Sequence, residues 1–148
     1  MKKITAALLS LLLLCAALFS CDPKAPKITD RTWKLASVTV EDDRGIDTLL
    51  CVSDQYVALF GEGEDLPRVD YRLRAKNKKL TLWNAEGDEK FIGKYNKGEE
   101  FTPDTRVYEI TLESKSGYAV VTRAADGEGK AFYTLSLSVG EHTLLFFK

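Results

Sequence analysis

The sequence predicts an all-β protein, in which an antiparallel meander of about eight or nine strands closes into one barrel. From Thr32 onward, runs rich in β-branched, aromatic and leucine residues recur roughly every ten to fifteen positions, with turn residues between them. Most runs alternate apolar and polar residues, as strands with one buried face do, and no segment keeps a 3.6-residue period. Closure removes the exposed edges that an open meander would leave, although a sandwich also fits this pattern.

The expected strands follow one another without any helix between them. The first begins at Thr32, and its apolar phase shifts at Ser37, which indicates a bulge or a bend. The second run, over residues 50–60, is interrupted near Ser53. Because no crossover helix is visible, neighbouring strands are expected to be antiparallel. The later strands are expected over residues 69–74, 80–82, 91–95, 107–113, 118–120, 133–139 and 144–147.

The first twenty residues differ from the rest of the chain. Two lysines, Lys2 and Lys3, precede an apolar run from Ala6 to Phe19, which is shorter than the ~20 residues that a membrane-spanning helix needs. This arrangement is typical of a secretory signal peptide. We therefore expect a signal peptide over 1–20, a polar, proline-containing tether over 21–29, and a single domain over 30–148.

Composition excludes several classes of function. The 148 residues include 21 basic and 22 acidic side chains, a formal net charge of −1, and removal of the two lysines of the signal peptide makes the charge −3. This balance argues against nucleic-acid binding. Three cysteines and one histidine are too few for a zinc or iron–sulfur centre. Cys51 lies in an apolar run and is expected to be a buried small hydrophobe.

The end of the signal peptide resembles the lipobox of bacterial lipoproteins. In Leu18-Phe19-Ser20-Cys21, Leu occupies position −3, a small residue position −1 and Cys position +1. The resemblance implies that Cys21 carries fatty acyl chains such as palmitate, which anchor the domain to a bacterial membrane. The outer membrane is favoured, with the domain in the periplasm or at the cell surface. Cleavage by ordinary signal peptidase, which would leave Cys21 as a thiol, is the alternative.

The mature chain is similar to the lipocalin-like (calycin-type) lipoproteins of Bacteroidetes-type bacteria. The similarity lies in Thr32-Trp33-Lys34-Leu35, in residues 51–60 and in the apolar final strand over 143–148. Two positions before Trp33, where lipocalins have glycine, this chain has Arg31. The resemblance implies an eight-stranded up-and-down barrel whose mouth holds a small apolar ligand, and it supplies no catalytic residues.

Aromatic side chains with polar tips fall on the same alternating faces as the leucines and valines, and they would suit a pocket for an amphiphile. A barrel of about eight strands either fills its interior or holds one ligand, so a filled core is the alternative. The candidate cavity-lining residues are Trp33, Tyr71, Tyr95, Tyr108, Tyr118 and Tyr133.

Basic residues concentrate between positions 68 and 79, opposed only by Asp70. They form a candidate patch for an anionic partner, or else a solvated face that discourages aggregation. Trp83 follows Leu82 out of phase and is expected to point outward, where it is a weaker candidate for sugar or partner contact. The basic candidates are Arg68, Arg72, Arg74, Lys76, Lys78 and Lys79.

Neither a catalytic nor a metal-binding pattern is recognisable. The acidic turns lack the alternating ligands of a calcium loop, and there is no nucleophile elbow, HExxH or phosphate loop. We therefore expect a non-enzymatic protein without a cofactor, which binds a small hydrophobic or amphiphilic ligand. The alternative is a protein-interaction module. One version is a lysozyme-type inhibitor, whose loop the Ser116-Gly117-Tyr118 segment resembles, and another is an accessory subunit of an envelope complex.

Overall fold

The structure, a computed structural model, describes residues 24–148, and both the expected signal peptide and the expected lipidation at Cys21 lie outside the described residues. This part of the chain contains ten strands, one short α-helix and one 3-10 helix. In chain order they are η1 (Ile28–Asp30), β1 (Thr32–Glu41), β2 (Asp47–Val52), α2 (Asp54–Phe60), β3 (Tyr71–Lys76), β4 (Lys79–Asn84), β5 (Lys90–Tyr95), β6 (Glu99–Thr102), β7 (Thr105–Leu112), β8 (Lys115–Ala125), β9 (Ala131–Val139) and β10 (His142–Phe147).

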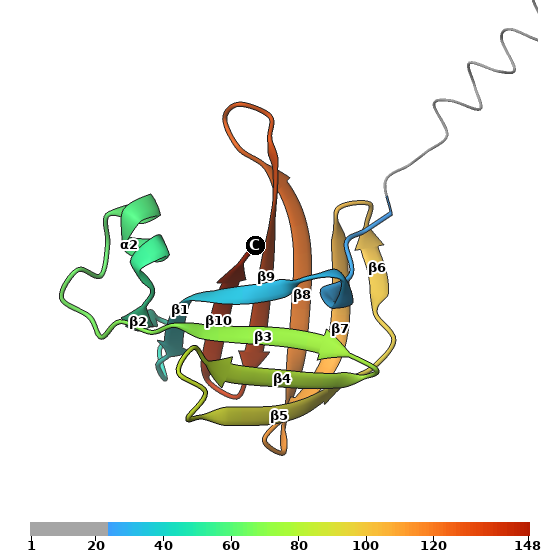
Figure 1. Cartoon of the computed structure of the whole chain (residues 1–148), viewed down its shortest axis with the longest axis horizontal. Helices are drawn as coiled ribbons and strands as arrows, with labels where there is room; N and C mark the ends of the chain where they lie inside the picture. Colours follow the sequence, from blue (N-terminus) through green and yellow to red (C-terminus); the bar gives the residue numbers. More distant parts are fainter. Residues whose placement is uncertain (1–23) are drawn as a thin grey trace, which may run out of the picture.

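Eight of these strands form a closed antiparallel barrel. The order of neighbours is β1-β3-β4-β5-β7-β8-β9-β10, and β10 pairs with β1 to close the ring (Figure 1). The two remaining strands lie off this path, since β2 pairs with β1 and β6 pairs with β7. The all-β, antiparallel barrel predicted from the sequence is therefore confirmed.

Strand β1 changes neighbours halfway along its length. Thr32–Lys34 pairs with β3, whereas residues 37–41 pair with β2. Its register with β10 shifts between Leu35 and Ser37, which is where the apolar phase changes in the sequence. This irregularity confirms the predicted bulge, and it lets one strand serve both the barrel and the β1–β2 hairpin.

The expected continuation of the second strand to residue 60 is wrong, because the chain turns into helix α2 after Val52. The Ser53 hydroxyl caps the helix by accepting from the Tyr56 amide at 3.2 Å, and Gly61, at φ +65°, ends it. The rings of Tyr56 and Phe60, four residues apart, pack 4.7 Å from each other. Seven residues are too few to show a helical period, so only the caps could have indicated this helix.

Strand β6 was not predicted from the sequence, because its four residues are all exposed and therefore show no alternation.

The β3–β4 hairpin joins the two strands that were expected over residues 69–74 and 80–82. Asn77 and Lys78, at φ +51° and +61°, form the two-residue turn that suits the twist of paired strands.

The hydrophobic core lies inside the barrel. Alternate residues of the strands point inward, and the largest fully buried side chains are Trp33, Phe146, Ile28, Leu73, Leu80, Leu135, Leu137, Val52 and Val121. Ile28 comes from η1, outside the strands, so the segment before β1 contributes to closing that end of the barrel.

Candidate functional site

One end of the barrel is closed by η1. Trp33 donates from Nε1 to the Ile28 carbonyl at 2.9 Å, and the Ile28 amide donates to the Tyr108 hydroxyl at 3.1 Å. The Arg31 guanidinium lies 3.8 Å from the centre of the Tyr133 ring and 5.5 Å from that of Trp33, within range of cation–π attraction. These contacts fix the first residues of the domain against the core and close the barrel interior at this end.

The opposite end contains an open cavity of about 460 Å³. All eight barrel strands contribute to its wall, together with β2 and the segment before β3. Most of its surface is apolar, which is the character expected of a site for a hydrophobic ligand. The lining residues are Leu35, Val38, Cys51, Val69, Tyr71, Leu82, Phe91, Leu112, Glu113, Lys115, Val139, His142 and Leu144.

Polar groups stand at the mouth of this cavity. The Tyr71 hydroxyl donates to the Glu89 carboxylate, and this hydrogen bond, helped by desolvation, raises the pKa of Tyr71 to about 12. The Glu113 carboxylate accepts from the Ile92 amide at 2.7 Å. The cavity therefore combines apolar walls with a polar rim, an arrangement that suits an amphiphile with its polar end outward.

Cys51 lies on this cavity wall. It is half-buried rather than fully buried, and partial desolvation raises the pKa of its thiol. Because the thiolate is the nucleophilic form, Cys51 remains a weakly reactive thiol at neutral pH. Its position makes it a natural reporter of cavity occupancy.

Of the six residues proposed from the sequence to line a cavity, only Tyr71 lines this one. The structure places Trp33, Tyr108 and Tyr133 at the closed end and Tyr118 on the outer surface, where it is 57% exposed. The sixth, Tyr95, packs edge-on against Tyr108 at 5.8 Å, towards the closed end. Alternation indicates which face of a strand is apolar, but it does not indicate which end of the barrel is open.

The residues that sequence reasoning missed are mostly aliphatic. Val38, Leu82, Leu112 and Leu144 occupy apolar positions of their strands, yet nothing in the sequence distinguishes a cavity wall from a packed core. Phe91, at the mouth end of β5, packs against Tyr71 with ring centres 6.4 Å apart.

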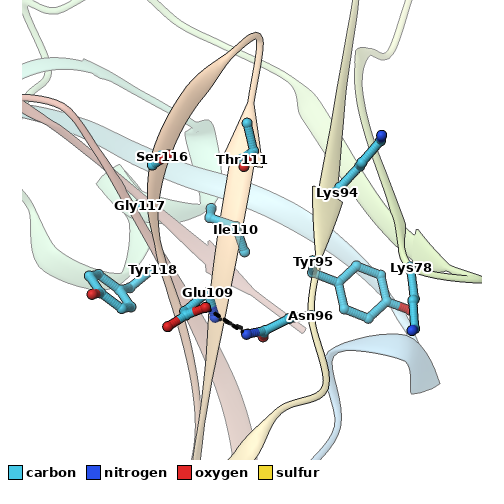
Figure 2. A pocket seen from close by; sticks show the side chains of 10 residues that line it. All are labelled: Lys78, Lys94, Tyr95, Asn96, Glu109, Ile110, Thr111, Ser116, Gly117 and Tyr118. Carbon is cyan, nitrogen blue, oxygen red and sulfur yellow. Dashed lines mark hydrogen bonds between the residues drawn. The ribbon is translucent and has the colours of Figure 1, made fainter.

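A second hollow, of about 580 Å³, lies on the outside of the barrel where β5 separates from β7 (Figure 2). Two hydrogen bonds between Asn96 and Glu109 bridge the gap. The Asn96 side-chain nitrogen donates to the Glu109 carboxylate at 2.9 Å, and the Glu109 backbone amide donates to the Asn96 side-chain oxygen at 3.0 Å. Lys78 and Lys94 lie on one side of this pair and Tyr118 on the other. Polar groups make up a larger share of the surface of this hollow than of the mouth cavity.

The six basic candidates do not form one patch. Arg68 is held inside the loop between α2 and β3, where it pairs with Asp54 at 3.1 Å and donates to the Gly63, Leu66 and Glu64 carbonyls. The other five lie on the outer face or the turn of the β3–β4 hairpin: Arg72, Arg74, Lys76, Lys78 and Lys79. Trp83 is half-buried on the same outer face.

The fold and the cavity together define a lipocalin-like β-barrel with one closed end and one open end. No protein-family model, curated protein or solved structure matches this chain. In the range 24–148, no group of three or more histidine, cysteine, aspartate or glutamate side chains is placed to hold a metal ion. Nor does any helix in that range have the length and apolar character needed to cross a bilayer.

Proposed function

We propose that this protein is a lipid-anchored, non-enzymatic binding protein of a bacterial cell envelope, which holds a small hydrophobic or amphiphilic ligand in the mouth of its barrel. The observation that supports ligand binding is the apolar cavity of about 460 Å³ to which every barrel strand contributes. This volume lies within the range of about 300–1,000 Å³ that small-molecule sites occupy.

The distribution of polar groups favours an amphiphile over a purely apolar ligand. The interior wall is built from residues such as Leu82, Leu112 and Leu144, which would contact an acyl chain or a ring system. At the rim, Lys115 and His142 offer hydrogen-bond donors to a polar head group. The ligand would therefore enter with its apolar part first.

Ligand binding is tested by extracting the purified protein with organic solvent and identifying what is released by mass spectrometry, followed by displacement of a fluorescent fatty acid. Val139→Phe adds a ring to the cavity wall, whereas Ser138→Phe adds the same ring at the neighbouring exposed position. We expect the first variant to weaken binding about tenfold, roughly 1.4 kcal/mol, and the second to leave it unchanged. Equal binding by both variants, or no binding by the parent protein, would contradict the proposal.

Lipid anchoring is tested separately by metabolic labelling with an alkyne analogue of palmitate. Cys21→Ser is expected to abolish the label and release the protein from the membrane fraction, and Cys51→Ser to retain both. Labelling that survives Cys21→Ser would rule out the proposed anchor.

A protein-interaction module is the second candidate, and an exposed apolar patch favours it. Leu59 is 61% exposed, Phe60 53% and Phe132 39%, and all three border a hollow of about 350 Å³ beside α2. Co-purification from crosslinked cells, compared between the parent protein and Leu59→Ser, tests this candidate, and an identical set of partners for both would argue against it.

A further inference from the structure

The two ends of the barrel differ in their charged side chains. Because the strands are antiparallel, the turns β1–β2, β4–β5, β7–β8 and β9–β10 all lie at the mouth. The β3–β4 turn lies at the closed end with η1, as does the β8–β9 turn, which contains Asp126, Glu128 and Lys130. The four mouth turns contain a single cation, Arg44, and it pairs with Asp42 at 2.7 Å. Their carboxylates are Asp42, Asp43, Glu86, Asp88, Glu89, Glu113 and Glu141.

The closed end instead carries a cluster of exposed lysines, here called the basic rim, at the side where the chain enters the barrel. Three of its members face one another directly across β3, β4 and β5, and the other three line one hollow beside η1. Among the side chains that the structure describes, which do not include that of Asp30, no member of the basic rim has a carboxylate within 4.0 Å. The basic rim consists of Lys27, Lys76, Lys78, Lys79, Lys94 and Lys97.

The lysines of the basic rim repel one another in the isolated protein. Like charges placed directly opposite on neighbouring strands destabilise a sheet, and Lys76, Lys79 and Lys94 form such a row. Carboxylates also occur near this end: Asp104 pairs with Arg123, and Glu109 lines the same hollow as Lys78 and Lys94. An anionic surface held against the basic rim would therefore relieve part of the repulsion among Lys76, Lys79 and Lys94.

An exposed aromatic ring lies at the same end. Phe101 of β6 is 79% exposed, more than any other large hydrophobic side chain among the described residues. Strand β6 leads into the β6–β7 turn, close to where the chain enters the barrel (Figure 1). Surface-bound membrane segments present exposed apolar side chains together with basic ones to the headgroup region, and this end carries both, although two exposed glutamates, Glu99 and Glu100, precede Phe101 in β6.

The tether keeps this end near any membrane that holds Cys21. The six residues from 22 to 27 separate Cys21 from η1, and they span at most about 20 Å when extended. The surface potential of anionic lipids decays over a Debye length of ~8 Å at physiological ionic strength. A tether of this length is short enough to keep the basic rim close to the membrane and flexible enough to let its lysines enter this layer.

We propose that the basic rim and Phe101 dock on an anionic lipid surface, so that the barrel stands with its closed end on the membrane and its cavity mouth facing away. This inference rests on the proposed lipid anchor at Cys21. It assigns the closed end to membrane contact and leaves the acidic mouth free to receive a ligand or a partner from the aqueous side.

Energy transfer from the full lipidated protein to vesicles tests this orientation. In a Cys51→Ala background, a donor dye is attached at Thr102→Cys near the closed end or at Ala85→Cys in a mouth turn. Vesicles contain a headgroup-labelled acceptor and either phosphatidylglycerol with phosphatidylethanolamine or phosphatidylcholine alone. The two positions are roughly 25 Å apart along the barrel, given about 3.3 Å per strand residue, so transfer from residue 102 should exceed that from residue 85 about twofold on anionic vesicles.

If the lysines of the basic rim hold the barrel in this orientation, three further results are expected. The difference between the two positions should shrink on phosphatidylcholine, in 0.5 M NaCl and in the triple variant Lys76→Gln, Lys79→Gln, Lys94→Gln. A matched variant at the mouth end, Arg44→Gln, Lys90→Gln, Lys115→Gln, removes the same charge and should retain the difference.

The possible failures are distinguishable. Equal transfer from both positions on anionic vesicles, with the protein still anchored, overturns the orientation alone. A difference that persists on phosphatidylcholine overturns the role of charge. Recovery of the protein outside the vesicle fraction overturns the lipid anchor and therefore also the proposed orientation on the membrane.

Discussion

Replacing Trp33 by phenylalanine tests how the barrel is closed. The Trp33 side chain is fully buried and donates its indole N–H to the Ile28 carbonyl at 2.9 Å. Phenylalanine keeps an aromatic ring at this position but removes the donor and part of the volume. Fewer contacts would then hold η1 against the closed end of the barrel.

The expected loss of stability has two parts. Leaving a buried carbonyl without its donor costs about 1–3 kcal/mol. The void left by the smaller ring adds about 1 kcal/mol, towards the low end for large-to-small core changes. The sum, about 2–4 kcal/mol, corresponds to a Tm lowered by about 10 °C for a domain of this size.

The assay is urea unfolding followed by circular dichroism, with Trp83→Phe as the matched control. Trp83 is half-buried on the outer face, so its replacement should cost less than about 1 kcal/mol. Displacement of a fluorescent fatty acid should be unchanged in both variants, because neither residue lines the mouth cavity. Equal destabilisation by the two variants would refute the assignment of Trp33 as the residue that holds η1.

Three other predictions follow from single side chains. The Cys51 thiol should react with maleimide about tenfold more slowly in the folded protein than in urea, and palmitate should slow the reaction of the folded protein further. A rate that palmitate leaves unchanged would argue against occupancy of the cavity. Alkaline absorbance titration should show one tyrosine with a pKa of about 12, and Glu89→Gln should move it down towards about 10. Because the folded-state pKa of Tyr71 lies above the unfolded value, this contribution to stability is complete below pH ~10 and is lost as the pH rises to ~12, a loss that Tyr71→Phe should not show. Arg68→Ala should destabilise the α2–β3 loop by about 1 kcal/mol and speed its proteolysis, whereas Arg74→Ala, on the outer face of β3, should not.

Most strands could be predicted because each buries one face. The alternation in β3, β7 and β9 follows directly from that burial, and even the bulge near Ser37 left a phase shift in the sequence. Two elements were missed for physical reasons. Helix α2 is shorter than two full helical repeats and is specified by its caps, and β6 buries no side chain.

The site was less predictable than the fold. Tyr71 and Tyr133 both occupy positions of alternating strands, yet the first lines the open cavity and the second lies beneath Arg31 at the closed end. The difference depends on η1, a three-residue turn that follows the proline-containing tether and has no apolar pattern of its own. The end of the barrel that η1 closes therefore decides which tyrosines can contact a ligand.

The sequence by itself determined the class of fold and the position of most strands, because hydrophobic alternation and turn chemistry are local properties of the chain. Only the tertiary structure decided that the barrel has one closed and one open end, and that β3, β4 and β5 bring Lys76, Lys79 and Lys94 into one row. Both depend on strand register and on packing between residues far apart in the chain. Neither burial at an end nor cross-strand proximity can be read from a local pattern.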